Sequence, residues 1–327
     1  MSNASSEFVM PSGSKYAGLP IDVSSRRSIE IRPGESGEKL IAENESHATV
    51  DYFYHNGTYW RAIVPLNGAD AIVGQGFNFS KPRTRKGKNG REIILNKFGL
   101  PKRTIPILNH LQTRVTMKPD QPVKLYELGS EDFGEPAHVV RDFVYSVETA
   151  GPAGIEFNLR DALRGNLLSA HRFFSTQEMA FERLVVQNQL VTESPPLPLN
   201  EEEKRKLMIR SLIRAHHAGM SERYYIFRIC GTSNCTSNPL QILDSVVQYN
   251  LRQKLGSLFY RLPLNPRFYL RIRGLDSDPS FRKIVRTEFE DLIQDDRVQK
   301  RKRTFVREQI RIRRAGQALL KSKASES

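Results

Sequence analysis

The residue pattern changes character at Gly151-Pro152-Ala153-Gly154, and this change constrains the fold more than any other feature of the chain. Before it, apolar and polar residues alternate in short runs, which is typical of half-buried strands. After it, apolar residues mostly recur every three or four positions, which is typical of helices. Strands in one half and helices in the other predict an α+β domain, with an antiparallel sheet packed on helices.

The clearest strand pair lies on either side of Asn56-Gly57, because Asn-Gly between two alternating runs is a strong hairpin signal. The runs are Ala48–Tyr54 and Tyr59–Val64. Strict alternation in the first run places three residues on one face of the strand: Val50, Tyr52 and Tyr54. Shorter strand-like pieces are expected at 29–31, 39–42, 69–73, 123–128 and 138–149.

Besides a helix after Cys235, four helical segments are expected after the break, at 159–172, 176–190, 200–218 and 281–320. Ser175 is placed to cap the second of them, and Asn200 to cap the third. Acidic residues follow Asn200 in the first turn, where they suit the helix dipole. Gly219 can end this third helix, because glycine adopts the conformation that a helix C-terminus requires.

The net charge of +14 comes from two segments of the 327-residue chain. Residues 81–103 carry nine basic residues and one acid, and residues 281–327 carry fourteen basic residues and seven acids. The remainder is close to neutral. Such local basic segments suit nucleic acid, anionic lipid or another acidic surface, and they are also common as solvated loops and helices.

The composition excludes several other classes of protein. We find no apolar run near 20 residues and no signal-peptide core, so a soluble chain is expected. Two cysteines exclude a disulfide scaffold and a cysteine-based zinc site, and neither a metal nor a cofactor is predicted. We expect a flexible leader at 1–28, one domain at 29–275 and a basic helical extension at 276–327.

Cys235 is the strongest candidate for chemistry. It follows an aromatic run at 224–227 and a small polar turn, and it stands where a helix begins, with Asn234 or Ser233 as the cap. Leucine and valine at helical spacing after it give that helix a face to bury. A thiol at a helix N-terminus is expected to favour the thiolate, which is the nucleophile. Cys230 ends the apolar run and is expected to be a packing residue. A Cys230–Cys235 disulfide is the alternative.

A cysteine nucleophile needs a base within hydrogen-bond reach, and histidine is the commonest. His47 stands at the start of the strand Ala48–Tyr54 and is the preferred candidate, while His138, which begins another strand, is a competitor. His110 and His171 are expected to be structural. The remaining histidines are expected to be solvated: His55, His216 and His217.

Several of these motifs resemble the Lnb-type N-terminal periplasmic domain family. They are Leu199-Asn200-Glu201-Glu202-Glu203, Tyr224-Tyr225 with Phe227, Asn234-Cys235-Thr236-Ser237 and Leu243-Asp244. Ser46-His47-Ala48 resembles the early Gly-His stretch of that family, with Ser46 in place of the glycine. The resemblance covers roughly residues 40–250.

The resemblance implies a papain-like fold of the permuted NlpC type, in which the histidine precedes the cysteine. It implies Cys235 as nucleophile and His47 as base, with Asn234 beside the cysteine completing the candidate site. It names no third catalytic residue, and Asp51 is a weak choice. Members that move an acyl chain within bacterial lipoproteins suggest the bacterial envelope and an acyl-bearing peptide, protein or lipid as substrate.

The sequence therefore predicts cysteine-dependent acyl transfer or hydrolysis of an amide, ester or thioester. N–H groups at the start of the Cys235 helix are expected to hold the oxyanion. The alternative is a non-catalytic basic module that binds nucleic acid or an anionic membrane surface through residues 81–103 and 281–327.

Overall fold

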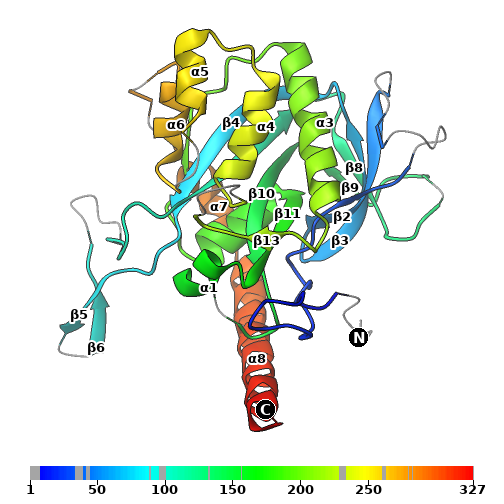
Figure 1. Cartoon of the computed structure of the whole chain (residues 1–327). Coiled ribbons are helices and arrows are strands. Elements are labelled where there is room, and N and C mark those ends of the chain that lie inside the picture. The colour runs from blue at the N-terminus through cyan, green and yellow to red at the C-terminus, as the bar shows by residue number, and fades with distance from the viewer. Residues whose placement is uncertain are drawn as a thin grey trace.

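The fold is known from a computed structural model of the chain (Figure 1). It describes residues 8–33, 40–41, 45–87, 90–95, 101–131, 133–155, 157–227, 233–259, 263–278, 280–281 and 283–326. Cys230 and half of the expected strand at 39–42 lie outside these ranges.

One large sheet organises the protein. Its central strands, in spatial order, are β4 (Ala69–Asn78), β7 (Asn109–Met117), β10 (Asp142–Ala150), β11 (Leu167–Ser175), β2 (His47–His55), β3 (Thr58–Pro65), β8 (Val123–Tyr126) and β9 (His138–Val140). Four short strands extend it: β12 (Thr192–Glu193) on β4, β14 (Lys283–Ile284) on β12, β1 (Glu30–Ile31) on β2 and β13 (Arg223–Tyr224) on β11. Among these described pairs only β11 with β2 is parallel, so the predicted α+β class with a mainly antiparallel sheet is confirmed.

Helices cover both faces of this sheet. On one face lie α3 (Glu201–Ala218), α4 (Ser237–Val246) and α6 (Pro266–Ile272), with α5 (Leu251–Ser257) packed on α6 (Figure 1). On the other lie α2 (Thr176–Met179), the π-helix η1 (Ala180–Val186), the 3-10 helix η2 (Val285–Phe289) and α7 (Glu290–Gln294). The long α8 (Asp296–Glu326) touches η1 and then projects away from the body, and α1 (Leu159–Arg164) precedes β11 (Figure 1).

Residues that follow one another along the central strands belong to two different cores. Tyr145 of β10 and Phe173 of β11 pack in the core beneath α3 and α4. Their neighbours Val144 and Phe174 pack in the core beneath η1. Successive side chains of a strand point to opposite faces, so both faces of β10 and β11 are buried.

This double burial explains why the prediction of a helix at 159–172 is wrong in its second half. The helix α1 ends at Arg164, where Gly165 adopts a left-handed conformation with φ of 66°. All nine residues of β11 are buried, so the strand lacks the polar–apolar alternation by which a half-exposed strand is recognised. The strand β7, six of whose nine residues are buried, was also not predicted.

The predicted hairpin at Asn56-Gly57 is confirmed, and both residues have the positive φ of a tight hairpin turn. The predicted alternation along β2 is wrong beyond Val50. The register shifts between Val50 and Phe53, and Tyr52 has a φ of 70°. This β-bulge places Val50 and Phe53 in the same core, while Tyr54 faces the other.

The helix caps in the second half are confirmed. Ser175 accepts a hydrogen bond from the Glu178 amide at the start of α2. Asn200 and Glu203 form a reciprocal capping box at the start of α3, and Gly219 follows its last residue.

Two predictions about the chain ends are wrong. Residues 8–28, expected to be flexible, pack against α1 and β11 and bury Met10, Leu19 and Ile21. The expected continuous helix 281–320 is interrupted at Asp295, whose side chain accepts hydrogen bonds from the first two N–H groups after Asp296. Asp295 thus caps α8, and the segment before it forms β14, η2 and α7 instead.

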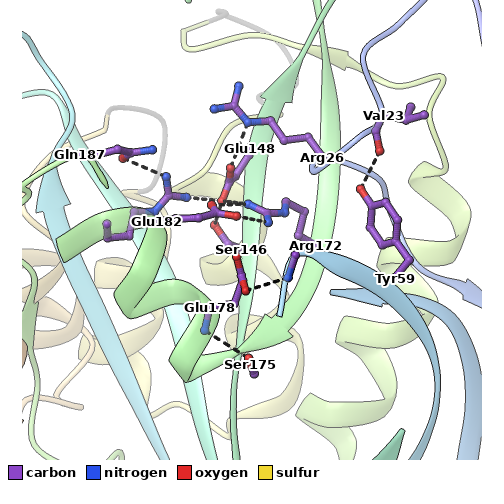
Figure 2. A network of polar contacts seen from close by, with 12 residues as sticks. Val23, Arg26, Tyr59, Ser146, Glu148, Arg172, Ser175, Glu178, Glu182 and Gln187 are labelled. Carbon is purple, nitrogen blue, oxygen red and sulfur yellow. Dashed lines mark hydrogen bonds and ion pairs between the residues drawn. The ribbon is translucent and has the colours of Figure 1, made fainter. Parts of the chain in front are cut away.

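A buried ion-pair cluster joins β10, β11 and η1 (Figure 2). Arg172 donates to both oxygens of Glu182, at 2.7 and 2.9 Å, and to Glu148 at 3.1 Å. Arg183 also pairs with Glu148, and Arg26 approaches the same carboxylate. Burial alone raises the pKa of Glu148, but the three guanidinium groups outweigh it and hold this pKa well below its usual value. The cluster therefore stays ionised inside the protein.

Replacing Arg172 by alanine is expected to lower the free energy of unfolding by about 3–5 kcal/mol, because it leaves Glu148 and Glu182 buried with less compensation. Urea unfolding at neutral pH measures this loss. The matched control is Arg85→Ala, which removes an exposed arginine paired with Glu92, and its expected effect is below about 0.5 kcal/mol. Equal small effects of the two substitutions would contradict the role given to the cluster.

Candidate functional site

A cavity of about 270 Å³ opens where β7 begins and β10 ends. Its walls come from the leader, β4, β7, β10, η1 and the segment before α4. The lining residues are Arg26, Phe77, Phe79, His110, Val147, Glu148, Thr149, Phe157, Arg183, Gln187, Gln189, Tyr224 and Cys235. It therefore combines a thiol, an imidazole, a phenol and charged groups with aromatic walls.

Asn234 positions the cysteine. Its side-chain oxygen accepts hydrogen bonds from the amides of Thr236 and Ser237, both at 2.8 Å, and its side-chain nitrogen donates to the Ile226 carbonyl. Asn234 thus accepts from the first N–H group of α4, although the N-cap position itself is Thr236, whose side chain makes no capping bond, and Asn234 is fully buried. Because the amides of Thr236 and Ser237 are already bonded to Asn234, these two groups are not free to hold an oxyanion.

The Cys235 sulfur is enclosed by polar atoms. The Tyr224 hydroxyl donates a hydrogen bond to Sγ at 3.4 Å, and the Asn109 carbonyl oxygen lies 4.0 Å from Sγ. Cys235 is a free cysteine, 1% exposed. Burial raises the pKa of the thiol, and the hydrogen bond from Tyr224 only partly opposes this shift. The expectation that the helix start favours the thiolate is therefore wrong for the protein without bound substrate.

His110 projects from β7 into the same cavity. Its Nε2 is 2.7 Å from Ser146 Oγ, which in turn donates to Glu148 at 3.4 Å. The ring stacks on Phe77, with 4.8 Å between the ring centroids. Burial lowers the pKa of His110 to about 3, and the nearby Arg183 guanidinium adds to this shift. At neutral pH the imidazole is thus uncharged, and so low a pKa makes it a weak base in the resting protein.

The structure does not bring His47 to this cavity. His47 is exposed at the start of β2, where its Nδ1 is 3.1 Å from Ser46 Oγ. In the sheet, β10 and β11 lie between β2 and β7, the strand next to Cys235. Neighbouring strands are about 4.8 Å apart, so these three steps amount to about 14 Å.

The other five histidines have partners elsewhere. His138, the second candidate base, packs edge-on against Trp60 and His55 near the far edge of the sheet. Three further rings are hydrogen-bonded and one packs on a neighbour: His55 with Ser175, His171 with Tyr145, His216 with Ile31, and His217 on His216. All seven histidines lie in the described ranges, and among them His110 alone lines the cavity of Cys235.

His110 was expected to be a structural residue, so the sequence did not identify it as a site residue. A signal was present, because the run from His110 alternates polar His110, Gln112 and Arg114 with Leu111, Thr113 and Val115. Reading this run as a strand would have paired a strand-borne histidine with the cysteine.

The cavity carries more positive than negative groups. Arg26 and Arg183 line it together with one carboxylate, Glu148. A second cavity of about 490 Å³ lies beneath α8 and shares three residues with the first: Arg26, Phe157 and Gln187. The two cavities are therefore neighbours.

The two basic segments project from the body. Part of the first forms a separate hairpin of β5 (Thr84–Gly87) and β6 (Gly90–Ile93) (Figure 1). On α8, five cations recur at intervals of three or four residues on the face opposite buried Gly316: Lys300, Arg303, Arg307, Arg311 and Arg314. In the described ranges no helix has the length and apolarity needed to cross a membrane, and no group of His, Cys, Asp and Glu is arranged to hold a metal ion.

Comparison with protein-family models, curated proteins and solved structures finds no match to this chain.

The raised thiol pKa predicts slow alkylation of Cys235 at neutral pH. In a Cys230→Ala background, reaction of the native protein with iodoacetamide at pH 7 is expected to be at least about tenfold slower than that of the unfolded chain. The rate should rise with pH as the thiol ionises. Tyr224→Phe removes a hydrogen bond that lowers the thiol pKa, so the midpoint of this rise should move to higher pH.

The measurement is the labelling rate across pH, read by intact mass. A midpoint that stays in place or moves down in Tyr224→Phe would contradict the assigned role of the Tyr224 hydroxyl.

Proposed function

We propose that this protein is a thiol-dependent enzyme that transfers or hydrolyses the acyl group of an amide, ester or thioester. Cys235 is the nucleophile, and His110, in place of His47, is the base. The observation that carries the proposal is that Cys235 and His110 line one cavity, from segments more than 120 residues apart in the sequence.

The hydrogen bonds around His110 are those of a general base. A base of this kind is oriented by a third group, and the Ser146 hydroxyl, itself bonded to Glu148, fixes the imidazole ring. The sulfur has hydrogen-bond partners other than His110 in the resting state. Proton transfer from the sulfur to His110 therefore runs through a water in the cavity, since catalytic hydrogen bonds are often long in enzymes without bound substrate.

The reaction proceeds in two stages. In the first, the Sγ–H proton passes to His110 as sulfur forms a bond to the substrate carbonyl carbon, whose π electrons move to oxygen. Collapse of this oxyanion breaks the bond to the leaving group, which takes the proton back from His110. In the second, water or an amine attacks the Cys235 thioester by the same route and releases the acyl product.

Positive charge in the cavity supports the oxyanion. The Arg26 side chain is 43% exposed and lines both cavities, so it can turn towards the developing charge. Arg183 is held beside Glu148 by its ion pair. Because the amides of Thr236 and Ser237 are occupied, these guanidinium groups are the better candidates for electrostatic stabilisation.

The arrangement supports a relationship to papain-like hydrolases. The helix that follows the cysteine, α4, packs on β7 and β10, and β7 carries the proposed base. A cysteine at a helix start opposite a strand-borne histidine on an antiparallel sheet is the geometry expected for that class. An acyl-bearing peptide, protein or lipid is the substrate class that we propose on this basis.

The test is the release of p-nitrophenolate from p-nitrophenyl esters of short and long carboxylic acids, with the acyl-enzyme detected by intact mass. Cys235→Ala should abolish both signals. His110→Ala should slow acylation by about 10²–10⁴-fold, the usual contribution of a general base. His47→Ala is the matched control and should leave the rate unchanged.

Circular dichroism confirms that each variant is folded. Loss of acylation in His47→Ala with full activity in His110→Ala would return the role of base to His47. Undiminished turnover in Cys235→Ala would exclude the thiol mechanism.

A further inference from the structure

A stripe of large apolar side chains on α5 and the two residues after it is exposed. Leu251, Leu255, Leu258 and Phe259 are 78, 58, 67 and 63% exposed. Single exposed apolar residues are ordinary on protein surfaces, but a contiguous group of this kind marks an interaction site. The stripe lies outside the cavity of Cys235, whose lining contains none of these residues.

The stripe is held outward by the packing of α5 on α6. Gly256, the buried residue of α5, meets the carbonyl of Ile272, where a side chain on Gly256 would clash. Leu251, Leu255 and Leu258 recur at intervals of four and three residues and lie on the helix face away from Gly256. The contact at Gly256 therefore fixes which side of α5 is buried and leaves the leucines to solvent.

Cations border the stripe. Arg252 and Lys254 are exposed on α5 itself, and Phe268, 47% exposed, adds an aromatic ring from α6. No acidic residue occurs between Tyr249 and Asp276 in the sequence. Leucine and phenylalanine on one side of a short helix, with lysine and arginine beside them, is the composition of helices that lie in the interface of a bilayer.

We propose that this apolar stripe, together with Arg252 and Lys254, docks the protein on the surface of an anionic lipid bilayer. The leucines and Phe259 enter the boundary between head groups and acyl chains, and the two cations meet lipid phosphates. A second copy of the chain fits less well, because a symmetric contact through this stripe would bring Arg252 and Lys254 of both copies together. The proposal is independent of the chemistry at Cys235.

The stripe and the basic row of α8 lie at opposite ends of the molecule (Figure 1). A flat surface that contacts α5 therefore does not run along the projecting part of α8. This separation allows the two basic surfaces to be tested against each other.

The experiment is co-sedimentation of the full chain with vesicles of phosphatidylcholine mixed with phosphatidylglycerol, and with vesicles of phosphatidylcholine alone. The wild type should bind the anionic vesicles more tightly. The variant with Leu251→Gln, Leu255→Gln, Leu258→Gln and Phe259→Gln should bind about 100-fold more weakly, because half-burial of each side chain accounts for several-fold in affinity. Arg252→Gln with Lys254→Gln should weaken binding about tenfold at low salt.

Two control variants change residues outside the stripe. Arg303→Gln with Arg307→Gln removes the same charge from α8 and should leave vesicle binding unchanged, as should Cys235→Ala. In a folded Leu255→Trp variant, the new indole emission should shift to the blue when anionic vesicles are added.

Absence of wild-type binding to either vesicle would overturn the proposal, as would undiminished binding by the glutamine variant. Loss of binding in the α8 variant alone would assign the lipid contact to α8 and overturn it also. A concentration-dependent dimer that the glutamine substitutions abolish, without vesicle binding, would identify a second copy as the occupant instead.

Discussion

The buried ion pairs around Arg172 are the interaction on which the rest of the structure depends. Arg172 of β11 bridges Glu148 of β10 and Glu182 of η1, so one side chain ties the middle of the sheet to the layer that covers it. Charges can be buried only when they are paired in this way. The seven-residue π-helix η1 presents Glu182 and Arg183 to this cluster in adjacent positions, and π-helical turns are found disproportionately near functional sites.

The same cluster shapes the chemistry of the cavity. Glu148 anchors Ser146, which positions His110, while Arg183 disfavours the protonated form of that imidazole. Burial raises the pKa of Cys235 on the other side. The resting site is therefore a neutral thiol beside a neutral imidazole. A substrate that places its carbonyl over the sulfur would be needed to draw the proton across, which protects the thiol when no substrate is bound.

Local sequence signals predicted the parts of the fold that depend on neighbouring residues. Three short-range features are present: the Asn56-Gly57 turn, the Asn200 and Ser175 caps, and the bond from the first amide of α4 to the Asn234 side chain. Local signals failed where contacts between distant segments determine the structure. The sequence of β11 alone predicts a helix. It forms a strand because β2, β10 and the two helical layers bury it on both faces. The β-bulge at Tyr52 and the packing of residues 8–28 are likewise tertiary effects.

The site shows the same division. Cys235 and Asn234 could be chosen from their place at a helix start, but the choice among seven histidines requires the order of strands in the sheet, which no local pattern contains.

The most direct test of the central claim is NMR of the histidine rings before and after carboxamidomethylation of Cys235 in a Cys230→Ala background. A shift of the His110 ring signals with those of His47 unchanged is the predicted result. Movement of the His47 signals, with those of His110 unaffected, would contradict the account.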